Sequence, residues 1–570
     1  MRLALVFPPQ WDPRQPPLGL AVLAGAARAA GVEVRVWDLN LALYRRLLGA
    51  CPGDGVEEAL RRRLSDPASL RDAAAYLQLT AAAQRVFDER ADPLGKWRLF
   101  WDTAGGPWAA GSRQAWQDML AGRVPMPFLA HLRPELAELL AWQPDLIGLS
   151  LIADTQLAAG LALVGWLRRQ PGGAERRLVL GGDALTYRRT ALAEARWLAE
   201  WVEAVVLGDG EPFLTAVAAG TPPAQAPNAL AWGERAGAAP VLAGPERPPP
   251  AFDLLPLDEY LTPALVMPVE TARGCPWGRC AFCIHPVRAP DGRPPWRPRP
   301  LERVAAEVRG LFAAGHRWFA VVDEAVPPGR LRELAEVFGG LPAPVGWIAY
   351  TRLDPGHDAA GLARVRAAGC RKLFVGLETG SDRLLARFRK GITAATARRV
   401  LLDMAAAGLA VHLFLMTGFP GEDEADQQAT LALLADVWPA FDPFGVTYDL
   451  FPLMAEVGTD LWEHPSRYGW AGPPGGPTGA NGPPDGGRAA PGGATSRHLV
   501  AGEPSGPAPA LELGWQVPVL PGPAGRARWQ DFRARLDALA DRICGPAFGL
   551  RQAALSQDAL HLLLLAARDS

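Results

Sequence analysis

The first forty residues alternate between short apolar runs and a helical stretch. Residues 2–7 form an apolar run before two prolines, which predicts a buried strand. Residues 16–31 read as a helix that ends at a glycine, and residues 32–38 predict a second strand. A strand, helix and strand in this order are typical of a parallel sheet.

The same alternation returns after an interruption. Residues 40–142 are rich in Ala, Leu and Arg and contain several Trp, which predicts a helical insertion. Further strands are then expected at 145–151, 176–183 and 203–211, with helices between them and a last helix to about 220. We therefore predict a doubly wound, Rossmann-like α/β domain over residues 1–220.

A second α/β series follows a Pro-rich linker at residues 221–262. Its expected strands are residues 265–274, 317–324, 345–353, 372–378, 409–418 and 445–453, and its expected helices are residues 301–314, 329–339, 359–368, 381–407 and 423–438. Six strand–helix repeats fall short of the eight of a full barrel. The pattern predicts an open, partial (β/α)6 barrel, similar to a truncated TIM barrel, over residues 263–455.

The remainder of the chain has two different compositions. We assign residues 456–525 to a flexible segment, because residues 471–510 contain 20 Gly or Pro among 40 positions and cannot bury enough apolar surface to order themselves. Residues 526–570 are rich in Ala, Leu and Arg. They predict a helical C-terminal region, with two helices around Gly545 and Pro546.

Charge and hydropathy exclude several classes of protein. The 58 Lys and Arg balance 60 Asp and Glu, which argues against a global basic field for nucleic acid or anionic membranes, so no nucleic-acid partner is expected. No apolar run is long enough to span a membrane, and the first residues do not read as a signal peptide. We expect a cytoplasmic protein.

Three of the six cysteines lie close together, at Cys275, Cys280 and Cys283, directly after the first strand of the second series. In a long chain without an export signal, such a group indicates metal or redox chemistry rather than disulfides. Three thiolates can hold three irons of a four-iron cluster and leave the fourth iron open for a ligand. The alternative is zinc, because the same cysteines and His285 could form a Cys3His site. The isolated Cys51, Cys370 and Cys544 are expected to be structural.

The cysteine loop resembles the C-x-x-x-C-x-x-C signature of radical S-adenosylmethionine (SAM) enzymes, in which an aromatic residue precedes the last cysteine. Phe282 stands at that position, although four residues, not three, separate the first two cysteines. The resemblance implies a [4Fe–4S] cluster with SAM bound at its open iron. No second group of cysteines exists for an auxiliary cluster, and the three additional cysteines of methylthiotransferases are missing.

Three further segments resemble the same superfamily, in the expected order. Asp323-Glu324 ends the second strand of the series, Gly376-Leu-Glu-Thr-Gly-Ser381 ends the fourth before a Lys-Gly-x-Thr, and Gly418-Phe-Pro-Gly-Glu422 ends the fifth. Strand carboxyl ends form the active face of such barrels. The cofactor-binding residues implied are Phe282, Asp323, Glu324, Arg352, Gly376, Glu378, Gly380, Ser381, Gly418 and Pro420.

The N-terminal domain lacks the G-x-G-x-x-G of a dinucleotide site. Small residues at its strand ends instead suit a large, mostly neutral ligand, and their order resembles the cobalamin-binding domain fused to many radical SAM enzymes. The D-x-H-x-x-G loop is absent, so no histidine offers a lower ligand to cobalt. The implied cobalamin contacts are Pro16, Leu18, Gly19, Leu20, Gly148, Ser150, Gly181, Gly182, Gly208 and Glu211.

Together the resemblances imply a cobalamin-dependent radical SAM enzyme of the class B methyltransferase type. Such an enzyme reductively cleaves SAM and uses methylcobalamin to methylate an unactivated carbon of a small-molecule or peptide substrate. It takes its electrons from a donor such as a flavodoxin or ferredoxin. The alternatives are a radical SAM enzyme whose N-terminal domain binds no cobalamin, and a zinc-bearing regulatory module.

Overall fold

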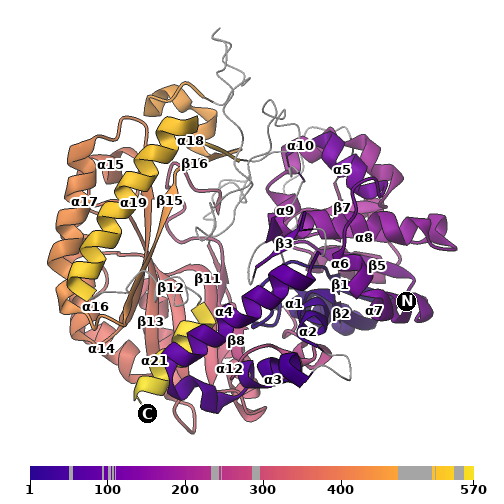
Figure 1. The fold of residues 1–570 in the computed structure, drawn as a ribbon, viewed down its shortest axis with the longest axis horizontal. Helices are drawn as coiled ribbons and strands as arrows, with labels where there is room; N and C mark the ends of the chain where they lie inside the picture. The colour runs from indigo at the N-terminus through magenta and orange to yellow at the C-terminus, as the bar shows by residue number, and fades with distance from the viewer. Residues whose placement is uncertain are drawn as a thin grey trace. The chain divides into compact units, whose positions relative to one another are not determined.

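The computed structural model divides into two compact units (Figure 1). Unit 1 is Met1–Leu265, and unit 2 contains Val266 and the later described residues. The structure describes residues 1–49, 55–92, 95–100, 104–105, 108, 111–230, 232, 243–244, 247–285, 296–472, 516–519, 522–544 and 558–569.

Unit 1 is built on a five-stranded parallel sheet. The strands are β1 (Arg2–Phe7), β2 (Glu33–Asp38), β5 (Leu146–Ser150), β6 (Leu178–Gly181) and β7 (Ala204–Val206), in the order β2-β1-β5-β6-β7. Their residues are mostly buried and apolar, as expected of strands covered on both faces. The order reverses between β1 and β5, which confirms the predicted doubly wound α/β fold.

Helices on the two faces cover this sheet. They are α1 (Leu18–Ala29), α8 (Leu157–Arg169), α9 (Asp183–Thr186), α10 (Arg189–Ala193) and α11 (Glu211–Ala218). Helix α1 packs against α11. Right-handed crossovers from β1 and from β5 run in opposite directions along the sheet, so α1 and α8 lie on opposite faces.

The segment between β2 and β5 is mainly helical, as the sequence predicts. It contains α2 (Leu39–Leu47), α3 (Gly55–Leu64), α4 (Ala73–Arg90), α5 (Arg113–Leu120), α6 (Phe128–His131), α7 (Arg133–Ala141) and the short strands β3 (Arg98–Leu99) and β4 (Ala104–Gly105). Helix α5 packs against α8, which joins the insertion to the sheet unit. Cys51 lies outside the described residues.

The described end of the Pro-rich linker packs onto unit 1. The amide of Ala251 donates to the carbonyl of Ala21 at 2.8 Å, and the hydroxyl of Tyr260 donates to Asp38 at 2.7 Å. Asp38 also caps α2 by accepting from the Leu41 amide at 2.8 Å. A buried carboxylate therefore joins a strand end, a helix start and the linker.

Asp38 makes the stability of unit 1 depend on pH. Burial raises the pKa of Asp38 to about 6, although the hydrogen bonds from Leu41 and Tyr260 act in the opposite direction. This value lies above that of an unfolded aspartate, about 4, so folding binds the proton more tightly. The free energy of unfolding should fall as pH rises between these two values.

We expect Asp38→Asn to stabilise the protein at pH 7.5 by up to about 3 kcal/mol and to make no difference at pH 4. Asparagine caps helices as well as aspartate, and its amide nitrogen can donate to the Tyr260 hydroxyl, so only the charge is lost. Thermal melts of both proteins at the two pH values test this. A variant that melts no higher than wild type at pH 7.5 contradicts it.

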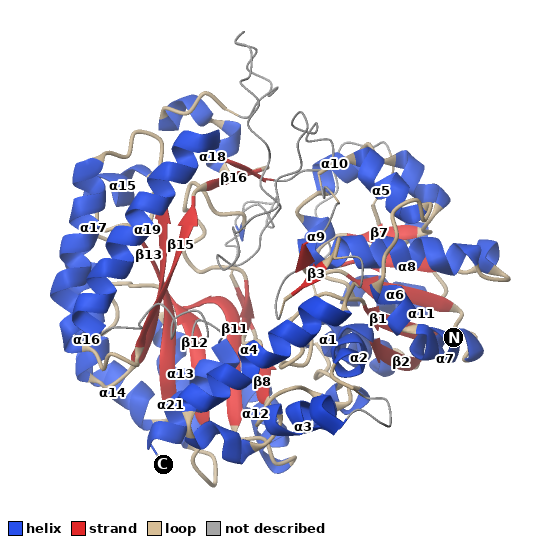
Figure 2. Ribbon diagram, viewed as in Figure 1, coloured by secondary structure: helices blue, strands red, loops and turns tan. Residues whose placement is uncertain are grey.

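Unit 2 contains a six-stranded parallel sheet that curves into an open barrel (Figure 2). Its strands are β8 (Val266–Val269), β11 (Trp318–Val326), β12 (Gly346–Thr351), β13 (Cys370–Glu378), β14 (Ala410–Thr417) and β15 (Val446–Pro452), paired in chain order. This confirms the predicted partial (β/α)6 barrel. The expected strand 265–274 is divided, because β9 (Ala272–Arg273) leaves the sheet to pair with β10 (Arg297–Pro298).

One layer of helices covers the outside of this sheet, and neighbouring helices in it pack together. The helices are α12 (Leu301–Ala313), α13 (Pro328–Gly339), α14 (Ala359–Ala367), α15 (Asp382–Arg387), α16 (Ala394–Ala406) and α17 (Glu424–Val437). The single helix predicted at 381–407 is wrong. It breaks at Arg389 and Gly391, which have φ angles of 57° and 77°, and Thr393 caps the start of α16.

The segment predicted to be flexible is structured at both described ends. Strand β16 (Met454–Glu456) pairs with β17 (Gln516–Pro518), and α18 (Asp460–Glu463) follows β16. Residues 473–515 lie outside the described residues. The C-terminal region contains the helices α19 (Gly522–Cys544) and α21 (Asp558–Asp569), and the predicted break at Gly545 and Pro546 lies outside the described residues.

The C-terminal helix α21 packs against β11, β12 and β13. His561 of α21 lies 2.7 Å from the amine of Lys372 on β13, and both side chains are fully buried. This contact fills the amino-terminal end of the barrel. Within the described ranges, none of the helices combines the length and apolar character needed to cross a bilayer.

Candidate active site

The three clustered cysteines lie on the loop that follows β8 and β9, at the carboxyl end of the first barrel strand. Cys275, Cys280 and Cys283 are half-buried free thiols. The loop turns at Gly274 and Gly278, which have φ angles of 82° and 59° that favour glycine. Gly278 lies within the four-residue spacing between the first two cysteines, so the additional residue is accommodated in a tight turn.

The cysteine loop is held against the turn between α15 and α16. The indole of Trp277 donates to the carbonyl of Arg389 at 2.8 Å and covers Gly391, where a Cβ would lie 2.2 Å from the ring. The amide of Ala281 donates to the carbonyl of Phe388 at 3.0 Å. The Arg-Lys-Gly turn that breaks the predicted helix is therefore the surface on which the loop rests.

A chain of polar contacts joins the cysteine loop to the end of β13. The amine of Lys390 donates to Glu378 at 2.6 Å, and both side chains are buried. The guanidinium of Arg352 donates to the Lys390 carbonyl at 2.5 Å and lies 3.9 Å from the sulfur of Cys280. Two cations and one carboxylate thus lie beside this thiol.

The electrostatics of the loop fit thiolate ligands. Burial raises the pKa of the Cys280 and Cys283 thiols, and for Cys280 the charges of Lys390 and Arg352 act in the opposite direction. A bound metal deprotonates a coordinating thiol, and nearby cations favour the resulting negative charge. Three soft sulfur donors on one loop are the donor set that an iron–sulfur cluster requires.

The convergence of side chains favours neither the Cys3His zinc site nor the cluster. Among the described residues, no three His, Cys, Asp or Glu side chains, the three clustered cysteines included, converge as ligands of a single metal ion. The ring of His285 lies 3.8 Å from a carboxylate oxygen of Glu324. His285 is therefore placed beside the end of β11.

The cysteine loop opens onto a cavity of about 500 Å³. The loop and two later segments line it together. The lining residues are Trp277, Gly278, Arg279, Cys280, Cys283, Arg389, Gly458, Thr459 and Asp460. The cavity is large enough for a cofactor or small ligand, and two of the three clustered cysteines, Cys280 and Cys283, line it.

Sequence reasoning missed several residues of this site. Asp460, at the start of α18, forms ion pairs with Arg389 at 2.8 Å and Arg467 at 3.1 Å and accepts from the hydroxyl of Tyr468. Asp460 follows the last barrel strand, where no motif marks it. Lys390 was not predicted as a site residue, although its place in the Lys-Gly-x-Thr segment was an available signal.

The two acids at the end of β11 bind backbone and side-chain donors of the neighbouring segment. Asp323 is buried, and its two oxygens accept from the amide and hydroxyl of Thr271 at 2.6 and 2.5 Å. Burial raises the pKa of Asp323 to about 6, against these hydrogen bonds. Glu324 accepts from the amide of Gly274 at 2.8 Å. Asp323 thus braces the start of the loop, and Glu324 holds the glycine that precedes Cys275.

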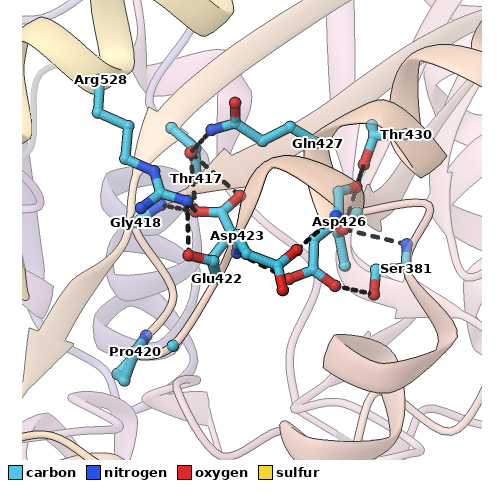
Figure 3. Close-up of polar contacts among 12 residues, drawn as sticks. Ser381, Thr417, Gly418, Pro420, Glu422, Asp423, Asp426, Gln427, Thr430 and Arg528 are labelled. Carbon is cyan, nitrogen blue, oxygen red and sulfur yellow. Dashed lines mark hydrogen bonds and ion pairs between the residues drawn. The ribbon is translucent and has the colours of Figure 1, made fainter.

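The predicted residues at the ends of β13 and β14 form a hydrogen-bonded turn (Figure 3). Glu422 accepts from the hydroxyl of Thr417 and, at 2.6 Å, from the amide of Gly418. Ser381 caps α15 and donates to Asp426 at 2.5 Å. The hydrogen bonds of Glu422 hold the turn that follows β14. In this turn Phe419 stands next to Pro420, and the ring of Phe419 contacts the ring of Phe282, with ring centres 6.4 Å apart.

Two predicted glycines allow close approach in the same region. A Cβ on Gly376 would lie 2.4 Å from a Glu378 oxygen and 2.7 Å from the Lys390 amine. A Cβ on Gly380 would lie 2.7 Å from the Cα of Thr430. Gly376 therefore leaves space for the buried ion pair, and Gly380 lets the end of β13 pack on α17.

The predicted residues of unit 1 gather around the carboxyl ends of its strands. Gly148 and Ser150 lie in β5, Gly181 ends β6, and Gly208 follows β7 and donates from its amide to Thr186 at 2.9 Å. A Cβ on Gly182 would lie 2.2 Å from the carbonyl oxygen of Leu151. The remaining predicted residues open the helices that follow the strands. Pro16, Leu18, Gly19 and Leu20 stand at the start of α1, and Glu211 begins α11.

A buried glutamine that no motif marks connects the loops after β1 and β5. The amide nitrogen of Gln156 donates to the carbonyl of Pro8 at 2.8 Å, and its oxygen accepts from the amide of Ile152 at 2.8 Å. The hydroxyl of Thr155 donates to the carbonyl of Gln10 at 3.0 Å. These contacts fix the edge at which the strand order reverses, where open α/β sheets bind ligands.

Comparison with known families decides the class of unit 2. The family model of the radical SAM superfamily matches residues 269–434 of this chain. This stretch is a radical SAM domain. It contains the cysteine loop and the strands from β9 to β14, and membership implies a [4Fe–4S] cluster and SAM as cofactors.

Curated relatives match only part of their own length. An uncharacterized methyltransferase, PH0819, of Pyrococcus horikoshii is 27% identical over 38% of this chain and 46% of that protein. A tRNA-2-methylthio-N(6)-dimethylallyladenosine synthase of Sorangium cellulosum is 32% identical over 30% of this chain and 38% of that protein. The chain thus spans less than half the length of these relatives.

Two solved structures share the fold over most of the chain. The radical SAM methyltransferase TsrM of Kitasatospora setae, with cobalamin and a [4Fe–4S] cluster bound, gives a TM-score of 0.53 at 18% identity, covering 95% of this chain and 89% of that one. The cobalamin-dependent radical SAM enzyme OxsB, with aqua-cobalamin bound, gives 0.53 at 15% identity, covering 77% and 52%. At these identities the likeness establishes the fold.

Proposed function

We propose that this protein is a cobalamin-dependent radical SAM enzyme that methylates an unactivated carbon of a small-molecule or peptide substrate. One observation carries the proposal. In a radical SAM domain, three half-buried thiols follow the first barrel strand, and two of them lie in the wall of a cavity of about 500 Å³. This arrangement can present an open iron to a ligand.

The protein's part in the proposed reaction is to bind and position the cofactors. When bound, the cluster supplies an electron and an iron with an open coordination site, and methylcobalamin supplies a methyl group. Cys275, Cys280 and Cys283 would hold the cluster. Arg352, 3.9 Å from the Cys280 sulfur, would place positive charge beside the thiolates.

The end of β13 would hold SAM. Glu378 has a φ of 66°, a conformation that L-residues rarely adopt, and its side chain forms an ion pair with Lys390. We propose that Glu378 and the backbone at Gly376 contact the nucleoside or methionine part of SAM. The ring of Phe282, packed on Phe419, would close the same site from the cysteine loop.

Unit 1 would hold cobalamin across the carboxyl edge of its sheet. The reversal of strand order between β1 and β5 supports this location, as does the likeness to folds whose bound ligand is cobalamin. No histidine stands between β1 and α1, so that loop would offer cobalamin no imidazole ligand. Backbone groups around Gly182 and Gly208, which follow β6 and β7, would make most of the contacts.

The proposed reaction consumes an electron for each SAM that is reductively cleaved. The external donor would be a low-potential carrier of the flavodoxin or ferredoxin class. Methylthio transfer, the activity in the name of the Sorangium relative, is not proposed, because these 570 residues contain no second group of cysteines for another cluster.

Metal content after anaerobic purification with cobalamin supplied tests the proposal. We expect about four irons and one cobalt per chain. Iron without cobalt would leave a radical SAM enzyme without a methyl carrier, the alternative function for the same cysteine loop. Zinc with little iron would contradict the cluster and favour the regulatory module.

A further inference from the structure

The inside of the barrel is filled at one end and open at the other. Near the amino-terminal ends of the strands, Lys372, Phe374 and His412 are at most 1% exposed. Nearer the carboxyl ends, the inward-facing residues are exposed or half-buried on five neighbouring strands. They are Val322, Tyr350, Gly376, Phe414, Met416 and Phe451, which we call the interior wall.

Exposure of this kind is unusual for parallel strands, which are covered on both faces. Val322 is 38% exposed in the middle of β11, and among the described residues the only other exposed large apolar side chain is that of Met1. Exposed apolar side chains gathered inside a barrel are candidates for a binding site. The interior wall lies in the half of the barrel that bears the cysteine loop.

The interior wall adjoins the candidate active site. Gly376 pairs with Phe414 across β13 and β14, two positions before Glu378. Glu378 contacts Lys390, whose carbonyl binds Arg352 beside Cys280. A molecule lying on Phe414 is therefore next to the groups that would hold SAM.

The aromatic rings of the wall pack on one another and on the buried ring of Phe374. The Tyr350 and Phe414 rings are nearly parallel, at 6° with centres 6.2 Å apart, and the Tyr350 and Phe374 rings lie 4.8 Å apart. The Phe414 and Phe451 rings follow at 6.3 Å. The two nearly parallel rings stand on β12 and β14, on either side of β13, whereas the rings on adjacent strands are tilted by 27° and 34°. A further planar ring can pack on such a cluster of rings.

The charge beside the wall helps to define its ligand. Asp449 on β15 pairs directly with Phe414, and its carboxylate lies 3.5 Å from the His412 ring. A carboxylate beside the rings disfavours a phosphate-bearing group. Met416, a polarizable side chain that packs well against rings, completes an apolar and adaptable surface.

We infer that the interior wall binds the planar aromatic part of the substrate, stacked on Phe414 and Tyr350. The inference rests on the proposed function, because it makes the barrel interior the place where the substrate meets SAM. It narrows the substrate class to molecules with an aromatic or conjugated ring system that carries no anionic group.

Binding of a planar probe to the full-length protein tests this inference without turnover. The probes are 2-naphthol and its saturated counterpart decahydro-2-naphthol, which share a hydroxyl and a carbon skeleton but differ in planarity. Calorimetric titration of the cluster-loaded protein, without reductant, should show tighter binding of 2-naphthol. Phe414→Leu should weaken 2-naphthol binding by about three- to tenfold and leave the saturated probe unchanged.

The matched control is Phe312→Leu, the same change at a half-buried ring on α12 in the outer helical layer. It should not change 2-naphthol binding. Val322→Glu provides a second test at an exposed position, where folding tolerates the change. It should weaken the binding of 2-naphthol, because it places a charge on the interior wall. Phe414→Tyr, which keeps the ring, should bind as wild type.

Several outcomes would overturn the inference: no binding of 2-naphthol, equal binding of the two probes, or wild-type binding by both Phe414→Leu and Val322→Glu. SAM cleavage, followed in parallel as 5′-deoxyadenosine formed with a chemical reductant, separates this failure from that of the proposed function. If SAM is cleaved but 2-naphthol binds no more tightly than the saturated probe, only the proposed stacking site is refuted. If 2-naphthol is preferred and the wall variants weaken its binding, but SAM is not cleaved, the stacking site stands and the proposed radical SAM activity is refuted.

Discussion

Cys280→Ala is expected to reduce 5′-deoxyadenosine formation from SAM to background and to lower the iron content sharply. Cys280 lies between the other two cysteines, faces the cavity and stands 3.9 Å from Arg352. With two thiolates left, three irons cannot all be held by the loop, so the open iron is no longer presented to SAM. Anaerobic reconstitution, iron analysis and chromatography of the products measure both effects.

Cys544→Ala is the matched control, because it removes a thiol from α19, where alanine favours the helix. It should keep its iron and its SAM cleavage. A Cys280→Ala protein that cleaves SAM at the wild-type rate would refute the assignment of the cluster to this loop. Use of a chemical reductant ensures that the result does not depend on a protein donor.

The fold followed from the sequence because its strands are short, buried and apolar, and are separated by helical periodicity. Both sheets lie where those runs stand. The break at 388–393 could not be predicted in the same way, because periodicity continues across it. Gly391 turns the chain there in order to accommodate Trp277, a residue 114 positions earlier, and only the tertiary structure reveals that contact.

The candidate site was predictable only in part, for a related reason. Sequence places polar residues at strand ends, but the alternation of side chains decides which of them face the site. Asp323 and Glu324 are neighbours, yet Asp323 is buried against Thr271 and only Glu324 reaches the glycine before Cys275. Asp460 was missed because it follows the barrel in a segment that composition alone marks as irregular.

Lys390→Met is expected to be among the most destabilising single changes in unit 2, by about 3–5 kcal/mol. Lys390 and Glu378 are 6% and 8% exposed and form one ion pair at 2.6 Å. Removal of the amine leaves a buried carboxylate without its counter-charge, and that cost exceeds what the pair contributes as a whole. Denaturant unfolding of the purified protein measures the loss.

A double-variant cycle with Glu378→Gln separates the structural role of the pair from binding of SAM. Each single variant should be strongly destabilised, whereas Lys390→Met/Glu378→Gln should recover much of the loss, because neither buried charge remains. If Glu378 contacts SAM, the double variant should still bind SAM weakly in equilibrium dialysis despite its recovered stability. If the losses of stability in the two single variants add in the double variant, the two charges do not act as a pair. If the double variant binds SAM as tightly as wild type, Glu378 does not contact SAM and serves only as the counter-ion of Lys390.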